Sequence, residues 1–184
     1  MIKKLFATAC FGVVLSGSAI AGECQPEGAY DQFAFRPPEG FVELRARHAS
    51  NGITYTFRED KLETEAAGVI QLVFNYTQDD YSLLKPEQQE EVKELYLKRY
   101  MGGFEGRRTE FKKSEIANES FGNSTYKKMT WSGKAGKEEM RGVMYVTVIN
   151  NVVTVVNLQL PTPGEEALEK SVYDCLGTLK LTLD

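Results

Sequence analysis

The residue types that most often perform chemistry are few and widely spaced in this sequence. The only histidine is His48, which lies in a basic segment with Arg45 and Arg47. Catalysis by a serine or cysteine nucleophile usually requires a base that a third group orients, and no nucleophile in a recognisable turn lies near His48. We therefore expect a solvated histidine in a loop. The alternative is that Arg45, Arg47 and His48 form a contact surface for an anionic partner.

Carboxylates gather in the segment that follows Pro86. They are Glu87, Glu90, Glu91 and Glu94. Such a group could serve acid–base or metal chemistry, but the spacing fits the wet face of a helix, with Lys98 four residues after Glu94. Asp79-Asp80 lacks the later ligands of a calcium loop, and Gly102 to Gly106 lacks the Lys-Ser/Thr of a phosphate-binding loop. The sequence therefore predicts no catalytic residue, no metal site and no cofactor.

The amino-terminal segment 1–21 has the three parts of a secretory signal peptide. Lys3-Lys4 supplies the positive charge, 5–15 is apolar, and Ala19 and Ala21 are the small residues before a cleavage site. The apolar part is too short to span a bilayer of about 30 Å as a permanent helix. We expect cleavage between Ala21 and Gly22, and therefore a periplasmic or secreted protein.

Removal of this segment changes the charge of the chain. It takes away two lysines and no acidic residue, so the formal net charge moves from −4 to −6. A mildly acidic protein has no long-range attraction for nucleic acid or for an anionic membrane. The remaining residues, 22–184, have the length of one domain with a core of its own. We expect it to be soluble, without a permanent membrane anchor, and a monomer or a weak dimer.

The same cleavage determines which cysteines remain in the mature chain. Cys10 is removed with the signal peptide, which leaves Cys24 and Cys175 as a pair in an exported protein. The simplest inference is one disulfide that ties the mature amino terminus to the last helix. Two cysteines so far apart make a poor metal site, and the remaining alternative is two free thiols.

Periods of two and of 3.6 residues predict the elements that carry these side chains. Asn51-Gly52 is a strong hairpin signal, and the apolar run Val152 to Val156 suits a central strand that is covered on both faces. The expected strands are 33–35, 41–47, 53–57, 69–76, 109–117, 124–132, 141–150, 152–160 and 178–183.

Two helices interrupt the strands. The first begins at Pro86 and ends near Gly102-Gly103 and Gly106, with one apolar face that should pack on the sheet. That face consists of Val92, Tyr96, Leu97, Tyr100, Met101 and Phe104. The second opens at Glu165-Glu166 and ends at Gly177. Its apolar face consists of Leu168, Val172, Cys175 and Leu176.

Tyr126 and Trp131 lie on one expected strand. An odd number of positions separates them, so a regular strand places them on opposite faces. One of the two would then be exposed and mark a contact surface. If both faces of the strand are covered, both aromatic side chains belong to the core instead.

Several segments together resemble the PsbP-like fold. They are the turn Phe35–Phe41, the helix region Leu95–Arg108, the strands Gly142–Val146 and Val152–Leu160, and the terminal Leu179-Lys180-Leu181. The resemblance implies an α+β domain, with an antiparallel sheet of about six to seven strands, a long amphipathic helix and a short carboxy-terminal helix. It also implies an interaction module without catalysis, as in bacterial periplasmic proteins of the DcrB type.

The function that we expect is a non-enzymatic periplasmic binding or accessory module. Its partner would be a protein, a peptide or a small hydrophobic, lipid-like ligand, held by the concave sheet or its rim. One alternative is an immunity or chaperone-type inhibitor of a toxin or effector. Others are a structural protein of the envelope and an enzyme, such as a hydrolase with an unrecognised site.

Overall fold

An antiparallel sheet of eight strands forms the centre of the computed structural model, which describes residues 24–61, 66–78, 80–164 and 166–183. The order is β3 (Phe41–Ala49), β4 (Gly52–Glu59), β5 (Val69–Tyr76), β10 (Val152–Pro161), β9 (Glu138–Ile149) and β8 (Ser124–Ala135). Two short strands, β6 (Thr109–Lys113) and β7 (Ala117–Phe121), both pair with β8. The expected signal peptide and its cleavage site at Ala19, Ala21 and Gly22 lie outside the described residues.

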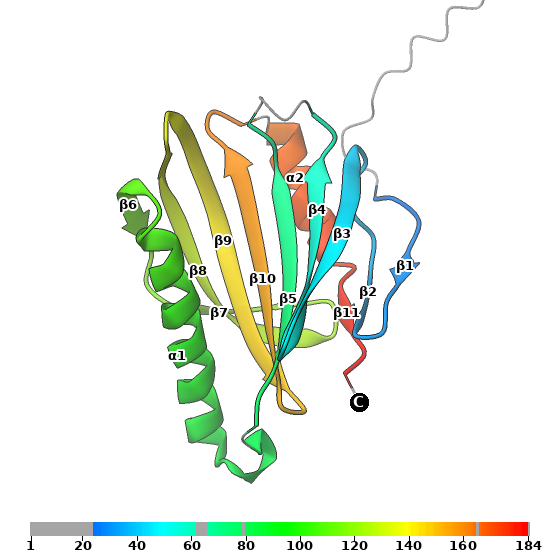
Figure 1. Cartoon of the computed structure of the whole chain (residues 1–184), viewed down its shortest axis with the longest axis vertical. Helices are drawn as coiled ribbons and strands as arrows, with labels where there is room; N and C mark the ends of the chain where they lie inside the picture. The colour runs from blue at the N-terminus through cyan, green and yellow to red at the C-terminus, as the bar shows by residue number, and fades with distance from the viewer. Residues whose placement is uncertain (1–23, 62–65, 79, 165, 184) are drawn as a thin grey trace, which may run out of the picture.

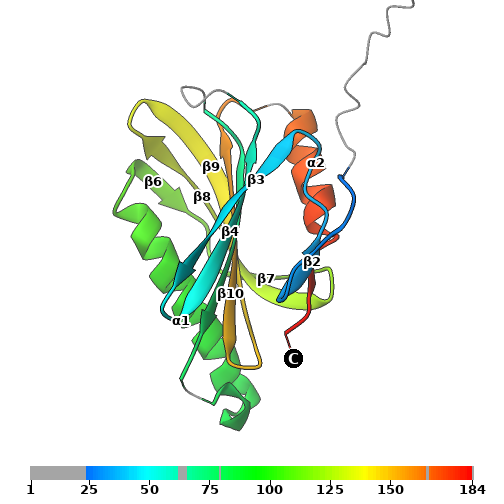
Figure 2. The ribbon, with the colours of Figure 1, turned by 45° about the vertical axis from the view of Figure 1, so that its right-hand side comes forward.

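The sheet separates two layers (Figures 1 and 2). Helix α1 (Pro86–Glu105), which follows the short helix η1 (Tyr81–Leu83), lies on one face. Helix α2 (Glu166–Leu176) lies on the other. A small sheet in the order β1-β2-β11 shares the face of α2 and consists of β1 (Gly28–Ala29), β2 (Phe33–Phe35) and β11 (Lys180–Leu181).

The expected α+β class is therefore confirmed. The main sheet is larger than expected because the segment predicted as one strand, 109–117, is divided. Its first part is β6, whereas β7 begins only at its last residue, Ala117, and extends beyond it, and the two strands pair with different stretches of β8. The segment predicted as the last strand contributes β11 to the small sheet instead of joining the main one. Among the described residues, no helix is long and apolar enough to cross a membrane.

The core is divided in two by the sheet, and β10 contributes to both halves. Its Val156 and Leu158 face the α2 layer, whereas Val153 and Val155 face α1. All four side chains are at most 1% exposed. The prediction of a central strand covered on both faces is confirmed, because β10 lies between β5 and β9.

Tyr126 and Trp131 correct one expectation. They lie on opposite faces of β8, as their spacing predicts, but both are buried, with exposed fractions of 1% and 3%. Phe121 stacks on Tyr126 at 4.2 Å between ring centroids, and Phe104 packs on Trp131 at 5.5 Å. The prediction that one of the two marks a contact surface is wrong, because covering residues lie on both faces of this strand.

Helix α1 begins as predicted at Pro86, where a missing N–H costs nothing. At its amino terminus, the Lys85 backbone N–H donates to the Gln88 side chain. The predicted apolar face packs on the sheet, with Leu97 and Met101 fully buried at its centre. The helix continues through the predicted glycine break to Glu105 and packs mainly against β9 and β8.

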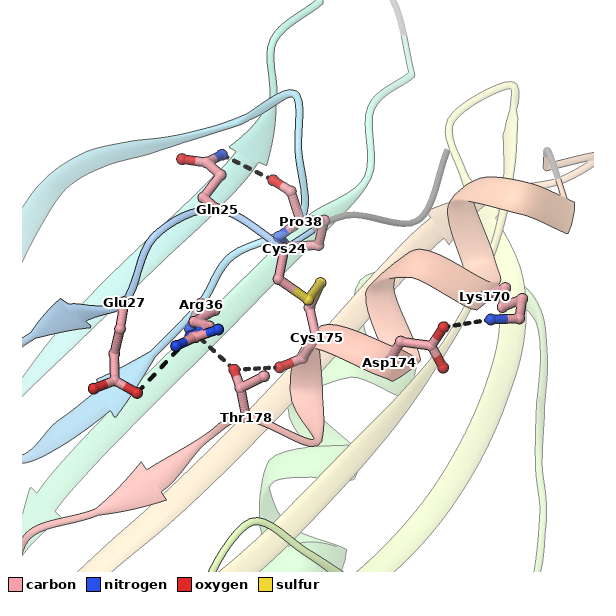
Figure 3. The surroundings of a disulfide bond; sticks show 9 residues. All are labelled: Cys24, Gln25, Glu27, Arg36, Pro38, Lys170, Asp174, Cys175 and Thr178. Carbon is pink, nitrogen blue, oxygen red and sulfur yellow. Dashed lines mark hydrogen bonds and ion pairs between the residues drawn. A yellow bond between two sulfur atoms is a disulfide. The ribbon is translucent and has the colours of Figure 1, made fainter. Parts of the chain in front are cut away.

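A disulfide joins the amino-terminal segment to α2 (Figure 3). The sulfur atoms of Cys24 and Cys175 are bonded, and the two Cα atoms are 5.6 Å apart. Thr178 Oγ1 donates to the Cys175 carbonyl oxygen at 2.7 Å and accepts from the Arg36 backbone N–H at 3.0 Å. The predicted pairing is present in the structure, and it fastens the chain ends to one layer of the fold.

Candidate functional site: the open face of the sheet

Helix α1 covers only part of the face on which it lies. It packs over β9 and β8, and Figure 1 shows no helix in front of β3 and β4. The alternation in β4 suits this arrangement, because Ile53 and Phe57 are buried on the α2 side while Thr54 and Thr56 are half-buried on the α1 side. We call the α1 side of β3, β4 and β5 the open face.

Two adjoining cavities occupy this region. The larger, of about 1100 Å³, lies over β3, β4 and β5, and the smaller, of about 630 Å³, lies between β5 and α1. Val73 lines the larger cavity and Asn75 the smaller. These residues are two apart on one strand and therefore point to the same side. Together the cavities form a trough that extends from β3 to the carboxy-terminal half of α1.

The floor of the trough is polar. The strand register places Asn157, Gln71 and Thr56 side by side on β10, β5 and β4. Asn157 Nδ2 donates to Gln71 Oε1 at 3.0 Å, while Asn157 Oδ1 has no hydrogen-bond partner among the described residues. The Asn157 side chain is only 2% exposed. A buried acceptor without a partner costs about 1–3 kcal/mol, so this polar group weakens the sheet rather than stabilising it.

Arginines flank the trough on both sides. Arg45 and Arg47 of β3 line the larger cavity, and Arg99 and Arg107 line the smaller one. Among the residues that the structure describes, none of these four is within ion-pair distance of a carboxylate. No Asp or Glu is found in the described lining of either cavity. The trough is therefore positively charged in a chain that is acidic as a whole.

Arg108 adds a fifth cation next to the end of α1. Its guanidinium lies 4.4 Å from the Phe104 ring centroid and 4.5 Å from that of Trp131, and Nη2 donates to Gln159 Oε1 at 2.7 Å. Burial lowers the pKa of Arg108, and the nearby charge of Arg107 lowers it further. Arg107 and Arg108 are thus close to one another, and Arg108 forms no ion pair with a carboxylate of the described residues.

His48 lies in strand β3 and not in the loop that we expected. The strand continues to Ala49 because His48 pairs with Ile53 across the hairpin. His48 is exposed and borders the larger cavity. Its partner Ile53 faces the α2 side, so the register directs the His48 side chain to that side, where it lines another cavity with Ile53 and Tyr55, whereas Arg47 pairs with Thr54 on the α1 side. The structure places Tyr126 and Trp131, the two aromatic residues predicted as contact residues, in the core.

The sequence interpretation missed Arg99 and Arg107. A usable signal was present, since Arg99 directly precedes Tyr100 of the apolar stripe and therefore lies at its border on the helix. What the sequence lacked was the position of the helix over the sheet. Without the position of α1 over the sheet, the edge of its apolar stripe that faces β5 could not be distinguished from the edge that faces solvent.

The glutamates of α1 have a structural role. Lys127 of β8 reaches across to Glu90 and Glu94, with Nζ–oxygen distances of 3.1 Å to each. A hydrogen bond from Lys93, and then one from Lys127, hold the pKa of Glu90 below its usual value. The predicted pair of Glu94 and Lys98 is present at 3.9 Å. In the described part of the chain, no three His, Cys, Asp or Glu side chains are arranged to hold a metal ion.

The architecture matches a solved structure over most of its length. The solution structure of cyanobacterial PsbP (CyanoP) from Synechocystis sp. PCC 6803 superposes with a TM-score of 0.60 at 14% identity, over 90% of this chain and 95% of that one. The chain has a PsbP-like fold. The resemblance read from the sequence is thereby confirmed at the level of fold, which is all that so low an identity shows.

Two further solved structures show weaker similarity to this chain. A crystal structure from Bacteroides thetaiotaomicron has a TM-score of 0.51 at 11% identity, over 83% of this chain, which spans only 46% of that protein. LpqN of Mycobacterium tuberculosis has a TM-score of 0.48 at 12% identity, over 82% of this chain and 83% of that one. No protein-family model matches the sequence, and no curated protein is significantly similar to it.

Proposed function

We propose that this PsbP-like protein is an exported accessory module that binds a partner on its open face and performs no chemistry there. The observation that carries the proposal is the trough itself, which is wide, polar and lined by charged groups without partners. The four arginines that line it, Arg45, Arg47, Arg99 and Arg107, are exposed and are therefore accessible to a partner of opposite charge. The fold supports a binding role only in general terms, because one fold can host many functions.

Export is part of the proposal. A disulfide persists in the periplasm or outside the cell and rarely in a reducing cytosol, and Cys24–Cys175 is bonded in the structure. The amino-terminal pattern of charged, apolar and small residues points the same way. Intact-mass measurement of protein from a periplasmic extract should give a chain that begins at Gly22 and has no free thiol.

Capture of a partner from native extract tests the binding face. Thr56→Trp would place a bulky ring in the middle of the trough, whereas Thr130→Trp makes the same change at an exposed position of β8 outside it. We expect the wild type and Thr130→Trp to retain the same partner and Thr56→Trp to lose it. Equal capture by all three proteins, or no specific capture by the wild type, would contradict the proposal.

A further inference from the structure

We infer that the partner group held by the trough is an acidic, extended segment of a protein, whose carboxylates bind the arginines of β3 and of the α1 end. This inference rests on the proposed function and names the chemistry of its ligand. It is carried by the juxtaposition of four unpaired arginines with a floor of neutral hydrogen-bonding side chains.

The distribution of charge gives the sign of the ligand. Acidic residues outnumber basic ones in the chain, 26 to 22, yet the described lining of the trough contains none. Two other surface cavities, beside β6, contain both signs. One is lined by Glu94, Lys98, Lys113 and Glu115, and the other by Glu110, Lys112, Lys134 and Glu139. The trough differs from these neutralised surfaces, and its charge is complementary to an anion.

The choice of arginine favours an oxyanion with two acceptor oxygens. Arg45, Arg47, Arg99 and Arg107 each present a planar fork that matches a carboxylate or a phosphate group with two parallel hydrogen bonds. By contrast, several lysines are already engaged by protein carboxylates. Lys113 is 2.6 Å from Glu105 and Lys134 is 2.6 Å from Glu110. The trough cations that have no carboxylate partner among the described residues are thus of the type suited to two-pronged recognition of carboxylate or phosphate oxygens, and the extent and floor of the trough decide between these two anions.

The dimensions favour an extended ligand over a small ion. One arginine pair lies on β3 and the other beside α1, with β4 and β5 between them. Three strand spacings separate β3 from β10, which amounts to about 15 Å. A single acetate- or phosphate-sized anion cannot reach both pairs, whereas a short extended peptide can.

The floor favours a peptide over other polyanions. Thr54, Thr56 and Gln71 supply hydroxyl and carboxamide groups that can both accept from a peptide N–H and donate to a peptide carbonyl. The rim adds apolar surface, since Leu44 is 43% exposed and Tyr96 lines the smaller cavity. An acidic segment with interspersed apolar residues matches the arginines, the hydrogen-bonding floor and the apolar rim together.

An anionic membrane surface fits less well. A bilayer that reached the trough would also meet the neighbouring helix α1, which exposes Glu87 and Glu91. The phosphates of such a bilayer would be repelled by these carboxylates. A narrow peptide avoids them, so the observations favour a protein segment.

The direct test uses the mature chain and a defined probe. The probe is an end-blocked peptide of about ten residues, roughly 33 Å when extended, with glutamate alternating with valine and serine. Its analogue carries glutamine at every glutamate. We expect binding of the glutamate peptide that is at least about tenfold tighter than binding of the analogue, and that weakens with salt. Amide shifts in NMR spectra should map this binding to β3, β4, β5 and the end of α1.

Paired variants provide the matched comparison. Arg45→Gln/Arg47→Gln and Arg99→Gln/Arg107→Gln should each weaken binding by about tenfold or more. Lys112→Gln/Lys137→Gln removes the same charge from exposed positions outside the trough and should change the affinity by less than about twofold. An equal loss in this control pair would reveal non-specific attraction and overturn the inference.

Other anions serve as competitors. If inorganic phosphate or phosphatidylglycerol vesicles bind with the same dependence on the four arginines, the occupant is not an acidic peptide and the inference fails. If the peptide does not bind while Thr56→Trp still abolishes partner capture, the inference fails and the proposed function stands. If Thr56→Trp also has no effect on capture, both fail.

Discussion

Among single residues, Lys127 and the arginines of the trough occupy different environments. Lys127 is almost fully buried between β8 and α1, where Glu90 and Glu94 both bind it. Burial disfavours its charge, but the hydrogen bonds to these glutamates outweigh burial and raise the pKa of Lys127. Within the described part of the chain, Arg45, Arg47, Arg99 and Arg107 form no ion pair. Ion pairs that hold the fold are therefore separate from charges that remain available to a ligand.

This separation leads to a pH-dependent prediction for Lys127→Met. The pKa of Glu90 is lowered in the folded state, so its contribution to stability is present at neutral pH and is lost as the pH falls below the usual carboxyl range. Between pH 7 and about pH 3, the free energy of unfolding of the wild type should fall by about 0.5–1 kcal/mol more than that of the variant. Urea unfolding at several pH values measures this difference. Lys98→Met, whose pair with Glu94 is exposed and 3.9 Å long, should show less than half of it.

The elements differ in how well the sequence predicted them, and the differences have physical causes. Strand β5 was predicted with its observed bounds, 69–76, because β-branched and aromatic residues alternate up to a clear polar boundary. The segment 109–117 was predicted as one strand, but β6 contains a register shift between Thr109 and Lys112 and ends at Lys113, and residues 114–116 are not in a strand. Neither the shift nor the break leaves a period in the sequence.

Contacts between elements were predictable only in part. The apolar stripe of α1 was evident from helical spacing, and so was the half-polar character of β4. The lateral position of α1 over β8 and β9 was not, because hydrophobic periodicity says which side of an element is buried and not which strands it covers. That position decides both the burial of Trp131 and the existence of the trough, which explains why the sequence left the burial of both aromatic residues open and why Arg99 was missed.

Helix α1 provides a prediction at the level of the element. Gly102 is exposed in its last turns, and a Cβ added there would meet no atom within 4 Å. Gly102→Ala should therefore stabilise the helix by about 0.5–1 kcal/mol and raise the Tm by roughly 2–4 °C. Gly142→Ala is the contrasting change, since its Cβ would lie 2.0 Å from the Leu158 carbonyl oxygen, and it should lower the Tm. A lower Tm for Gly102→Ala would mean that this part of α1 is not helical in solution.

The whole molecule consists of a sheet with one closed face and one partly open face. On the closed side, α2, the small sheet and the disulfide cover the aromatic core around Phe33 and Phe35. On the other side, α1 leaves β3 and β4 uncovered and contacts β5 through Asn75 and Tyr100 (Figure 1). Stability and ligand access are thus assigned to opposite faces, so changes in the closed layer should affect unfolding without altering the trough.

The disulfide tests this division for the whole molecule. Cys24 and Cys175 are 151 positions apart, and closing a loop of this length restricts the unfolded chain by about 4–5 kcal/mol in the chain-entropy model. Cys24→Ala/Cys175→Ala should therefore unfold with a free energy about 2–5 kcal/mol lower than the wild type, as measured by urea denaturation. Dithiothreitol should destabilise the wild type and leave the double variant unchanged. Because the bond lies on the α2 layer (Figure 3), the folded double variant should bind the acidic peptide as tightly as the wild type. A parallel loss of stability and affinity would show that the two faces are coupled.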